Sequence, residues 1–263
     1  MTRATPAPPA AGDHSASPAE PPESPRPRGI GGLIIGLLCA TLVAAGVLAY
    51  LVVRHRDEQA ALNRPTGIPA SVSTPLADLM QLSPVPATRA PGFTLTDQNG
   101  RVLSLASFRG HPVVLEFMDP HCVDICPIVS QEFINAYRNL GPAAARTVFI
   151  AVNVNPYYTS VRDMAAYSAE HQLTTIPTWH FLTGPLATLQ AVWRAYDISV
   201  AAPSRNADII HTSEVLFIDP SGRERYLAVP MADYTASHKA YLPAGLLAKW
   251  GQGIALVSRA LSR

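Results

Sequence analysis

The sequence holds 263 residues with a formal net charge of +1, and only 15% of its residues are charged. A nearly neutral chain gives no sign of the clustered basic surface that nucleic-acid binding needs, so we expect no nucleic-acid partner. The 25 prolines and three cysteines are unevenly spread, and the two ends of the chain differ in character.

The N-terminal segment is rich in proline. Residues 1–29 carry eight prolines among Ala, Ser, Glu and Arg, with hardly any large apolar side chain. Such a segment cannot bury enough surface to offset its chain entropy. The composition therefore predicts a disordered tail.

A long apolar segment follows. Residues 30–53 contain no Asp, Glu, Lys, Arg or His. At ~1.5 Å per residue, a helix of this length crosses a hydrocarbon core of ~30 Å. A cleaved signal peptide is the alternative, but its apolar core usually has ~7–15 residues, and no clear cleavage site follows here. We expect an uncleaved transmembrane helix, whose orientation is not decided by the arginines because they flank both of its ends.

Two further regions complete the chain. Residues 54–90 are rich in Pro, Ala, Ser and Thr, and they are predicted to form a linker. Residues 91–263 are long enough for one globular domain with its own core. The chain is therefore expected to consist of a tail, a membrane helix, a linker and a single folded domain.

Strand and helix patterns alternate within this domain. Asn99-Gly100 predicts a hairpin over 93–105, and continuous apolar runs predict buried strands over 112–118 and 147–154. The remaining predicted elements are helices over 127–141, 160–170 and 185–196, a strand over 178–182, a hairpin formed by EVLFID and ERYLAV, and a C-terminal helix. This order predicts an α/β fold in which helices flank a central sheet.

Two of the three cysteines lie in the stretch DPHCVDICPIVS, between a predicted strand and the start of a predicted helix. Unpaired N–H groups and the helix dipole favour negative charge there, which lowers a thiol's pKa below its free value of ~8.5. The thiolate is both a nucleophile and a metal ligand. The position of Cys122 and Cys126 therefore supports redox chemistry and metal binding alike.

The spacing of these cysteines distinguishes the alternatives further. Three residues separate them, and on a regular helix the Cβ atoms at i and i+4 are ~5–6 Å apart, whereas a disulfide requires ~3.8 Å. A disulfide across so short a loop would also constrain little of the unfolded chain. The spacing favours a metal ion between Cys122 and Cys126, with a redox pair and a structural disulfide as alternatives. Soft thiolates favour Cu(I) or Zn, but a structural zinc site needs four protein ligands.

Two thiolates need at least one further ligand, and histidine is the obvious type. Among the eight histidines, His211 lies in ADIIHTSEVLFIDPSGR, directly before a predicted buried strand. A histidine at the mouth of a strand is often a capping or surface residue, so position alone leaves its role open. We expect His180 to be a core or edge residue of its strand, and His121 to point away from the neighbouring thiol.

Four segments, in order, carry a resemblance to a known family. They are FTLTDQNGRVLSLASFRG, PVVLEFM, HCVDICP and HTSEVLFIDPSGR. From residue 91 to residue 250 the chain resembles the Sco/SenC family of membrane-anchored copper proteins, which have a thioredoxin-like fold and are involved in cytochrome c oxidase assembly. The chain departs from the family at Val123, where proline is usual, and in NVNPYYTS, where the family is more acidic.

The resemblance implies a set of ligands and a location. Cys122, Cys126 and His211 would bind one copper ion per chain, as Cu(I) or Cu(II). The domain would lie outside the cytoplasm, held at the plasma membrane by a single helix, with residues 1–29 on the cytoplasmic side.

The resemblance also implies a function, that of a metallochaperone. The protein would deliver copper to the copper-site subunit of a haem–copper oxidase during assembly, and another copper donor protein would load it. Two alternatives stay open. One is a membrane-tethered thiol–disulfide oxidoreductase that uses Cys122 and Cys126 as a redox-active pair, and the other is a redox or copper sensor.

Overall fold

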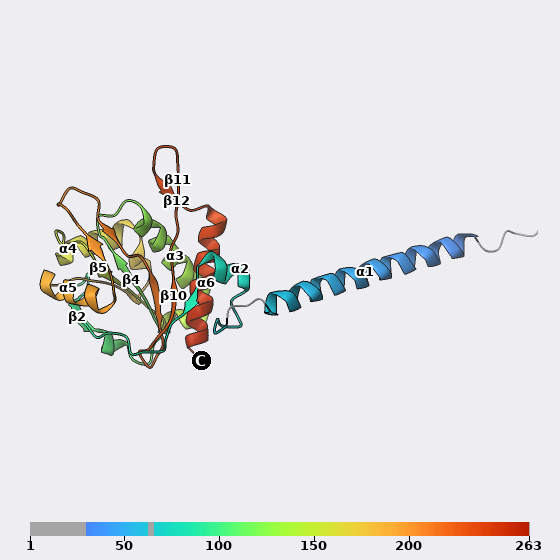
Figure 1. The fold of residues 1–263 in the computed structure, drawn as a ribbon, viewed down its shortest axis with the longest axis horizontal. Helices are drawn as coiled ribbons and strands as arrows, with labels where there is room; N and C mark the ends of the chain where they lie inside the picture. Colours follow the sequence, from blue (N-terminus) through green and yellow to red (C-terminus); the bar gives the residue numbers. More distant parts are fainter. Residues whose placement is uncertain (1–29, 63–65, 263) are drawn as a thin grey trace, which may run out of the picture. The chain divides into compact units, whose positions relative to one another are not determined.

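The structure is a computed structural model that describes residues 30–62 and 66–262. The chain divides after Arg56 into an N-terminal unit and a unit that runs from Asp57 to Arg263, and each unit is described by itself. The tail predicted over residues 1–29 lies outside the described residues. Figure 1 shows the order and the labels of the helices and strands.

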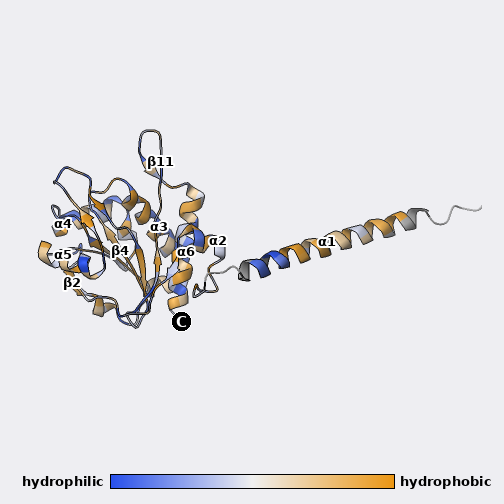
Figure 2. Ribbon diagram, viewed as in Figure 1, coloured by the Kyte–Doolittle hydropathy of each residue, from blue (hydrophilic) through white to orange (hydrophobic). Residues whose placement is uncertain are grey.

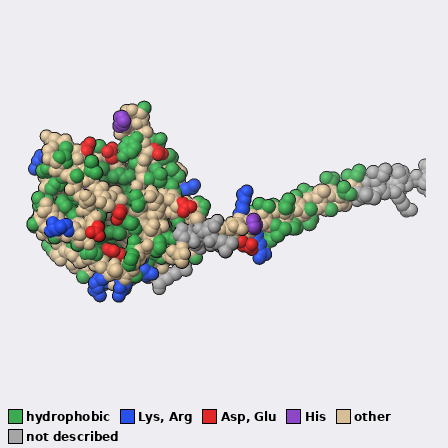
Figure 3. All heavy atoms as spheres, in the orientation of Figure 1, with side chains coloured by type: hydrophobic (Ala, Val, Ile, Leu, Met, Phe, Trp, Pro, Cys, Tyr) green, Lys and Arg blue, Asp and Glu red, His purple; other side chains and the backbone are tan. Residues whose placement is uncertain are grey.

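The longest helix, α1, spans Ile30–Leu62. Its segment Ile34–Arg56 can cross a membrane by length and composition. The side chains over 34–56 are exposed, and apolar side chains cover the helix up to a charged end (Figure 2, Figure 3). A helix that is apolar on every side requires a protein core or a bilayer around it. This pattern is the one expected of a transmembrane helix.

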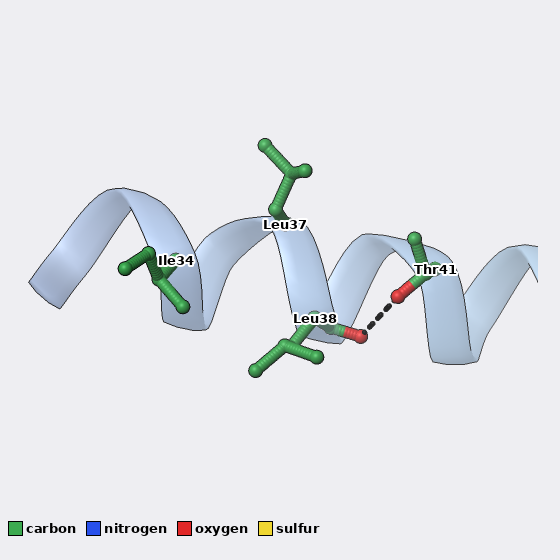
Figure 4. A pocket seen from close by; sticks show the side chains of 4 residues that line it. All are labelled: Ile34, Leu37, Leu38 and Thr41. Atoms are coloured by element: carbon green, nitrogen blue, oxygen red, sulfur yellow. Dashed lines mark hydrogen bonds between the residues drawn. The ribbon is translucent and has the colours of Figure 1, made fainter. Parts of the chain in front are cut away.

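One hydroxyl group within this apolar surface is satisfied by the helix itself. Thr41 Oγ1 donates a hydrogen bond of 2.9 Å to the carbonyl oxygen of Leu38 (Figure 4). A polar group without a partner in hydrocarbon costs roughly several kcal/mol, and an intrahelical bond avoids that cost. The shallow hollow that these two residues share with Ile34 and Leu37 is lined almost entirely by apolar atoms. It suits contact with lipid better than it suits a polar ligand.

A six-stranded sheet with the order β1-β10-β9-β4-β5-β6 forms the centre of the second unit. β4, β5 and β6 run parallel to one another, while β9, β10 and β1 continue the sheet in antiparallel pairs. Every residue of β4, β5, β6 and β9 is buried, as the continuous apolar runs predict. The six strands are β1 Ser83–Pro84, β4 Val113–Met118, β5 Val148–Asn153, β6 Trp179–Leu182, β9 Val215–Ile218 and β10 Glu224–Ala228.

Helices cover both faces of this sheet (Figure 1). One face packs against α2, α3, α4 and α6 through a core cluster that includes Phe133 and Trp250. The other face packs against α5 and the β2–β3 hairpin through a cluster that includes Leu95 and Trp193. The helices are α2 Thr74–Leu79, α3 Ile125–Leu140, α4 Val161–Glu170, α5 Leu186–Ala195 and α6 Ala244–Leu261, with short 3₁₀ helices over Leu105–Phe108, Gly141–Arg146 and Leu173–Thr175. The predicted fold, helices on a central sheet, is confirmed.

Three two-stranded ribbons lie beside the central sheet. β2 (Thr94–Thr96) and β3 (Val102–Ser104) form the hairpin predicted around Asn99-Gly100, and Gly100 has the positive φ of 78° that the turn requires. The other two ribbons are not predicted by the sequence pattern, because their strands have two residues each and show no periodicity. They pair β7 (Val200–Ala201) with β8 (Ile210–His211), and β11 (Asp233–Tyr234) with β12 (Ala240–Tyr241).

The structure differs from the linker predicted over residues 54–90. α1 continues to Leu62, α2 forms within the segment, and β1 is an edge strand of the central sheet. The segment also supplies buried apolar side chains to the core, namely Ile68, Val72, Leu76, Met80 and Leu82. Its composition resembles that of a tether, but burial of these side chains stabilises the ordered segment. The folded unit therefore begins well before residue 91.

Helices α3 and α6 approach each other closely because α6 carries a glycine where they cross. A Cβ atom at Gly251 would clash with the Cβ atom of Asn135 and lie 3.0 Å from the backbone nitrogen of Ala136. The two helices pack together in the core cluster that contains Phe133 and Trp250. The packing holds α3, whose first turn carries Cys126, against the C-terminal helix.

The first prediction concerns the boundary of the folded unit. A fragment that starts at residue 57 should unfold cooperatively in urea. A fragment that starts at residue 91 should show no cooperative transition. Each buried apolar side chain contributes about 1.5–3 kcal/mol to stability. The shorter fragment lacks five of them, and their summed contribution is comparable to the whole free energy of unfolding of a typical domain, ~5–15 kcal/mol. Circular dichroism during urea titration measures this. Equal transition midpoints for the two fragments would contradict the assignment of residues 66–90 to the core.

Candidate metal centre

The two cysteines lie at the junction between β4 and α3. α3 begins at Ile125, directly after its N-cap residue Asp124. The helix therefore begins two residues before Pro127, where the sequence pattern predicts its start. Proline is tolerated in the first turn because its missing N–H has no intrahelical partner there. Cys122 precedes the helix and Cys126 lies in its first turn, so the two are not the regular i, i+4 pair of a helix.

Both cysteines are free, and hydrogen bonds join them. The backbone N–H of Cys126 donates to Cys122 Sγ over 3.4 Å, and the Cys126 thiol donates to the same sulfur. Cys126 is 2% exposed, whereas Cys122 is half-buried. An incoming ion or disulfide would therefore meet the sulfur of Cys122 first.

These contacts separate the pKa values of the two thiols. The hydrogen bond from the Cys126 thiol lowers the pKa of Cys122 from 9.0 to about 7, and backbone groups of Cys126 and Asp124 act in the same direction against burial and the charge of Asp119. The same thiol–thiol bond, burial and the charge on Cys122 raise the pKa of Cys126 well above its usual value. Near neutral pH the protein therefore offers one reactive thiolate and one protonated, buried thiol.

Asp119 fixes the loop that carries Cys122. Its Oδ1 accepts hydrogen bonds of 2.8 Å from the backbone N–H of His121 and from Asn155 Nδ2, and its carbonyl oxygen accepts one of 3.1 Å from the backbone N–H of Cys122. The residue is buried, with 6% of its surface exposed. Hydrogen bonds of this kind compensate a buried carboxylate for the water that it loses. The loop is thereby tied to the segment that follows β5.

His211 lies at the end of β8 and presents a neutral imidazole. Its Nδ1 donates a hydrogen bond of 2.8 Å to the carbonyl oxygen of Thr212, which leaves the lone pair of Nε2 available to a ligand. Burial lowers the pKa of the ring below 6.5, against the effects of Thr212 and the charge of Asp119. The ring therefore stays unprotonated at neutral pH, which is the form that binds metals.

The structure brings the two thiols together but does not place His211 in a closed set of ligands. Among residues 30–62 and 66–262, no three His, Cys, Asp or Glu side chains are near enough to hold a metal ion. The charge of Asp119 nevertheless acts on both His211 and Cys122. For the three predicted ligands to bind one ion, His211 would need to move closer to the thiols.

Several residues around the thiols come from segments that sequence reasoning missed. A cavity of about 330 Å³ opens beside Cys122, and its lining joins the cysteine loop to residues 155–158 and to the connection between β7 and β8. His121 is directed to this cavity, where its ring stacks on that of Tyr158 with the ring centroids 3.7 Å apart. The sequence feature that could have indicated the residues 155–158 is the run NVNPYYTS at the end of a predicted buried strand. α/β proteins bind their ligands at the carboxyl ends of such strands.

The second prediction concerns the reactivity of the thiols. With Cys39 replaced by Ala, the rate of Cys122 alkylation by iodoacetamide should rise through pH about 7 and level off about one unit higher, because a lowered pKa yields thiolate at lower pH. Replacing Cys126 by Ala removes the main hydrogen-bond donor, so the midpoint should move towards pH 9. Mass spectrometry of the alkylated peptide measures both profiles. A wild-type midpoint near pH 9 would contradict the thiol–thiol contact.

The chain is similar to proteins of one known family. The SCO1/SenC family model matches residues 83–240. The mitochondrial protein SCO2 homolog of Bos taurus is 27% identical over 212 residues, which cover 78% of this chain and 73% of that protein. The SCO1 protein homolog of Bacillus subtilis is 23% identical over 133 residues, 50% of this chain and 68% of that protein.

A solved structure shows the same fold. The crystal structure of Arabidopsis thaliana ScoI with copper bound matches with a TM-score of 0.51 at 18% identity, covering 65% of this chain and 99% of that chain. The match of the family model covers more than half of the sequence and includes both cysteines and His211. The chain therefore belongs to the SCO1/SenC family.

Proposed function

We propose that this protein is a membrane-anchored copper chaperone whose domain lies outside the cytoplasm and delivers copper to a haem–copper oxidase during assembly. The observation that carries the proposal is the paired thiols of Cys122 and Cys126 at the start of α3, and the neutral imidazole of His211 is the third ligand that we propose. Copper is the cargo of the protein, and the function rests on binding the ion firmly and yet releasing it to a partner.

The donor set suits copper in both of its oxidation states. Two thiolates are soft ligands that select Cu(I), and Cu(II) prefers an additional nitrogen ligand. The low pKa of Cys122 supplies the first thiolate near neutral pH, while Cys126 must release its proton when the ion binds. His211 supplies the nitrogen through Nε2. The two thiolates would therefore be enough for Cu(I), whereas Cu(II) would also need the imidazole of His211.

Family membership supports the choice of copper and of the partner. The Arabidopsis relative was crystallised with copper bound, and the resemblance to Sco/SenC proteins implies a role in cytochrome c oxidase assembly. The partner would be the subunit that carries the oxidase's copper site, and a separate copper donor would load the chaperone. Anchoring by α1 would keep the domain at the membrane in which such an oxidase lies.

A second function is favoured by the asymmetry of the two thiols. A half-buried thiolate of low pKa beside a fully buried, protonated thiol is also the arrangement of a thiol–disulfide oxidoreductase, in which Cys122 would attack and Cys126 would resolve the mixed disulfide. This reaction has no need for an imidazole ligand. His211 therefore distinguishes a carrier from a reductase.

The third prediction uses this distinction. Replacing His211 by Ala should weaken Cu(II) binding by about a hundredfold or more, since loss of even an outer partner of a metal ligand typically costs 10–100-fold. Cu(I) binding should change much less, because both thiolates remain. The dithiol of the variant should still react with a small disulfide. Competition titrations with chelators of each ion measure the two affinities on the full chain in detergent.

Controls separate the carrier from the reductase. His238→Asn should bind both ions as the wild type does, because His238 lies on an exposed turn with a positive φ that Asn tolerates. Cys122→Ser should abolish the binding of one Cu(I) per chain. In cells, His211→Ala should fail to support oxidase assembly, with partial rescue by added copper. Normal assembly with His211→Ala and failed assembly with Cys122→Ser would favour the tethered reductase.

The fourth prediction concerns topology. A reporter enzyme that is active outside the cytoplasm should be active when fused to the C-terminus, and a reporter that is active in the cytoplasm should not. The reason is that α1 is long enough to cross the bilayer once, which separates its two ends, and that the family resemblance implies a folded domain on the outer side. Activity of the cytoplasmic reporter alone would contradict both the proposed location and copper delivery outside the cytoplasm.

A further inference from the structure

His211 is carried by a hairpin that is separate from the central sheet. β7 pairs with β8 so that Val200 lies opposite His211, and no strand of the six-stranded sheet pairs with either of them among the described residues. The backbone N–H of Thr212 donates to the carbonyl oxygen of Ser199 over 3.0 Å, which closes the base of the hairpin. The position of the imidazole therefore depends on how this hairpin is held against the rest of the domain.

Two tyrosines after β5 hold the connection between β7 and β8. Tyr157 Oη donates a hydrogen bond of 2.9 Å to the carbonyl oxygen of Ala202. The guanidinium carbon of Arg205 lies 4.9 Å from the ring centroid of Tyr158 and 5.8 Å from that of Tyr157, within the range of cation–π attraction. Both contacts join the loop of the hairpin to the segment 155–158.

The same segment is joined to the cysteine loop. The ring of Tyr158 stacks on that of His121, the residue before Cys122. Asn155 accepts a hydrogen bond from the backbone N–H of Tyr158 through Oδ1 and donates through Nδ2 to Asp119. The cavity of about 330 Å³ beside Cys122 is lined by these groups and by Arg205. Tyr158 therefore links the loop that carries the thiols to the hairpin that carries the imidazole.

We propose that Arg205, Tyr157 and Tyr158 are positioning residues, a latch that docks the His211 hairpin beside the cysteine loop and so governs Cu(II) binding. The inference rests on the copper-binding function proposed above. None of the three residues contacts the ion. They set the fraction of molecules in which the hairpin is docked on the segment 155–158, the arrangement from which the imidazole approaches the thiols, and the apparent affinity for an ion that needs all three ligands is proportional to that fraction.

The size of the effect follows from the contact that is removed. A cation–π pair at an exposed site changes an equilibrium by about two- to fivefold, and Arg205 is exposed. Arg205→Gln should therefore lower the equilibrium constant for docking of the hairpin by about two- to fivefold and the affinity for Cu(II) by up to that factor, the loss being smaller the more fully the hairpin is docked in the wild type. The affinity for Cu(I) should stay unchanged, because the two thiolates hold that ion without the hairpin.

The experiment uses the full chain in detergent and begins without metal. Hydrogen–deuterium exchange of the Thr212 amide, which donates to Ser199, reports on opening of the hairpin. Arg205→Gln should speed this exchange about two- to fivefold, and Tyr157→Phe should speed it through loss of the bond to Ala202. Arg205→Lys should restore part of the protection, because an ammonium group also binds a ring face. Arg162→Gln, a change of an exposed arginine on α4, is the matched control.

The second part measures both copper affinities for the same variants. A loss confined to Cu(II), with a changed Cu(II) absorption spectrum and partial rescue by Arg205→Lys, supports the latch. Equal losses for Cu(I) and Cu(II) would indicate a general structural role and would overturn it. Wild-type exchange and wild-type Cu(II) binding in Arg205→Gln would overturn it too, while leaving copper binding by the protein intact. If the wild-type protein binds no copper, the proposed function is refuted. The latch then cannot govern Cu(II) affinity either.

Discussion

The buried carboxylate of Asp119 is the group on which the arrangement of the candidate site depends. It sits at the end of a central strand and fixes the loop of Cys122 through the hydrogen bonds of His121 and Asn155. Its charge acts on Cys122 and on His211 from the same place. A buried carboxylate is stable only when it is hydrogen-bonded. Here its hydrogen-bond donors are a backbone N–H group and a side-chain amide from two different segments. The stabilisation of one carboxylate thus also shapes the surroundings of the thiols.

The domain limits other negative charge beneath the site. Glu116 on β4 and Glu132 on α3 are buried, and burial raises the pKa of Glu116 to about 8 and that of Glu132 well above its usual value. Both carboxyl groups are therefore mainly neutral at pH 7. The Ser213 hydroxyl donates to Glu116 Oε1 over 2.9 Å. The acidic side chains that line the cavity beside Cys122 are instead Asp119, Asp124 and Asp208.

Much of the fold could be predicted because its core elements are long and strongly patterned. β4 and β5 are continuous apolar runs, and α3 shows helical spacing. The segment 66–90 was missed because its composition resembles a tether, although Ile68, Val72 and Leu76 recur every four residues and lie in the core. The candidate thiols were predictable from a local motif. The contacts of Tyr158 and Arg205 were not, because they join segments that are distant in sequence and meet only in the folded chain.

The close crossing at Gly251 has a consequence for the order in which the protein matures. α3 begins with Cys126 in its first turn, yet the helix that packs along it, α6, is encoded in the last twenty residues of the sequence. In a chain that is still being synthesised, α3 can already pack on the central sheet through Phe133, which contacts Phe149 and Trp179, but the surface that α6 covers stays exposed until α6 has emerged. Emergence of α6 is therefore the step that completes the packing around α3, the helix that carries Cys126 in its first turn.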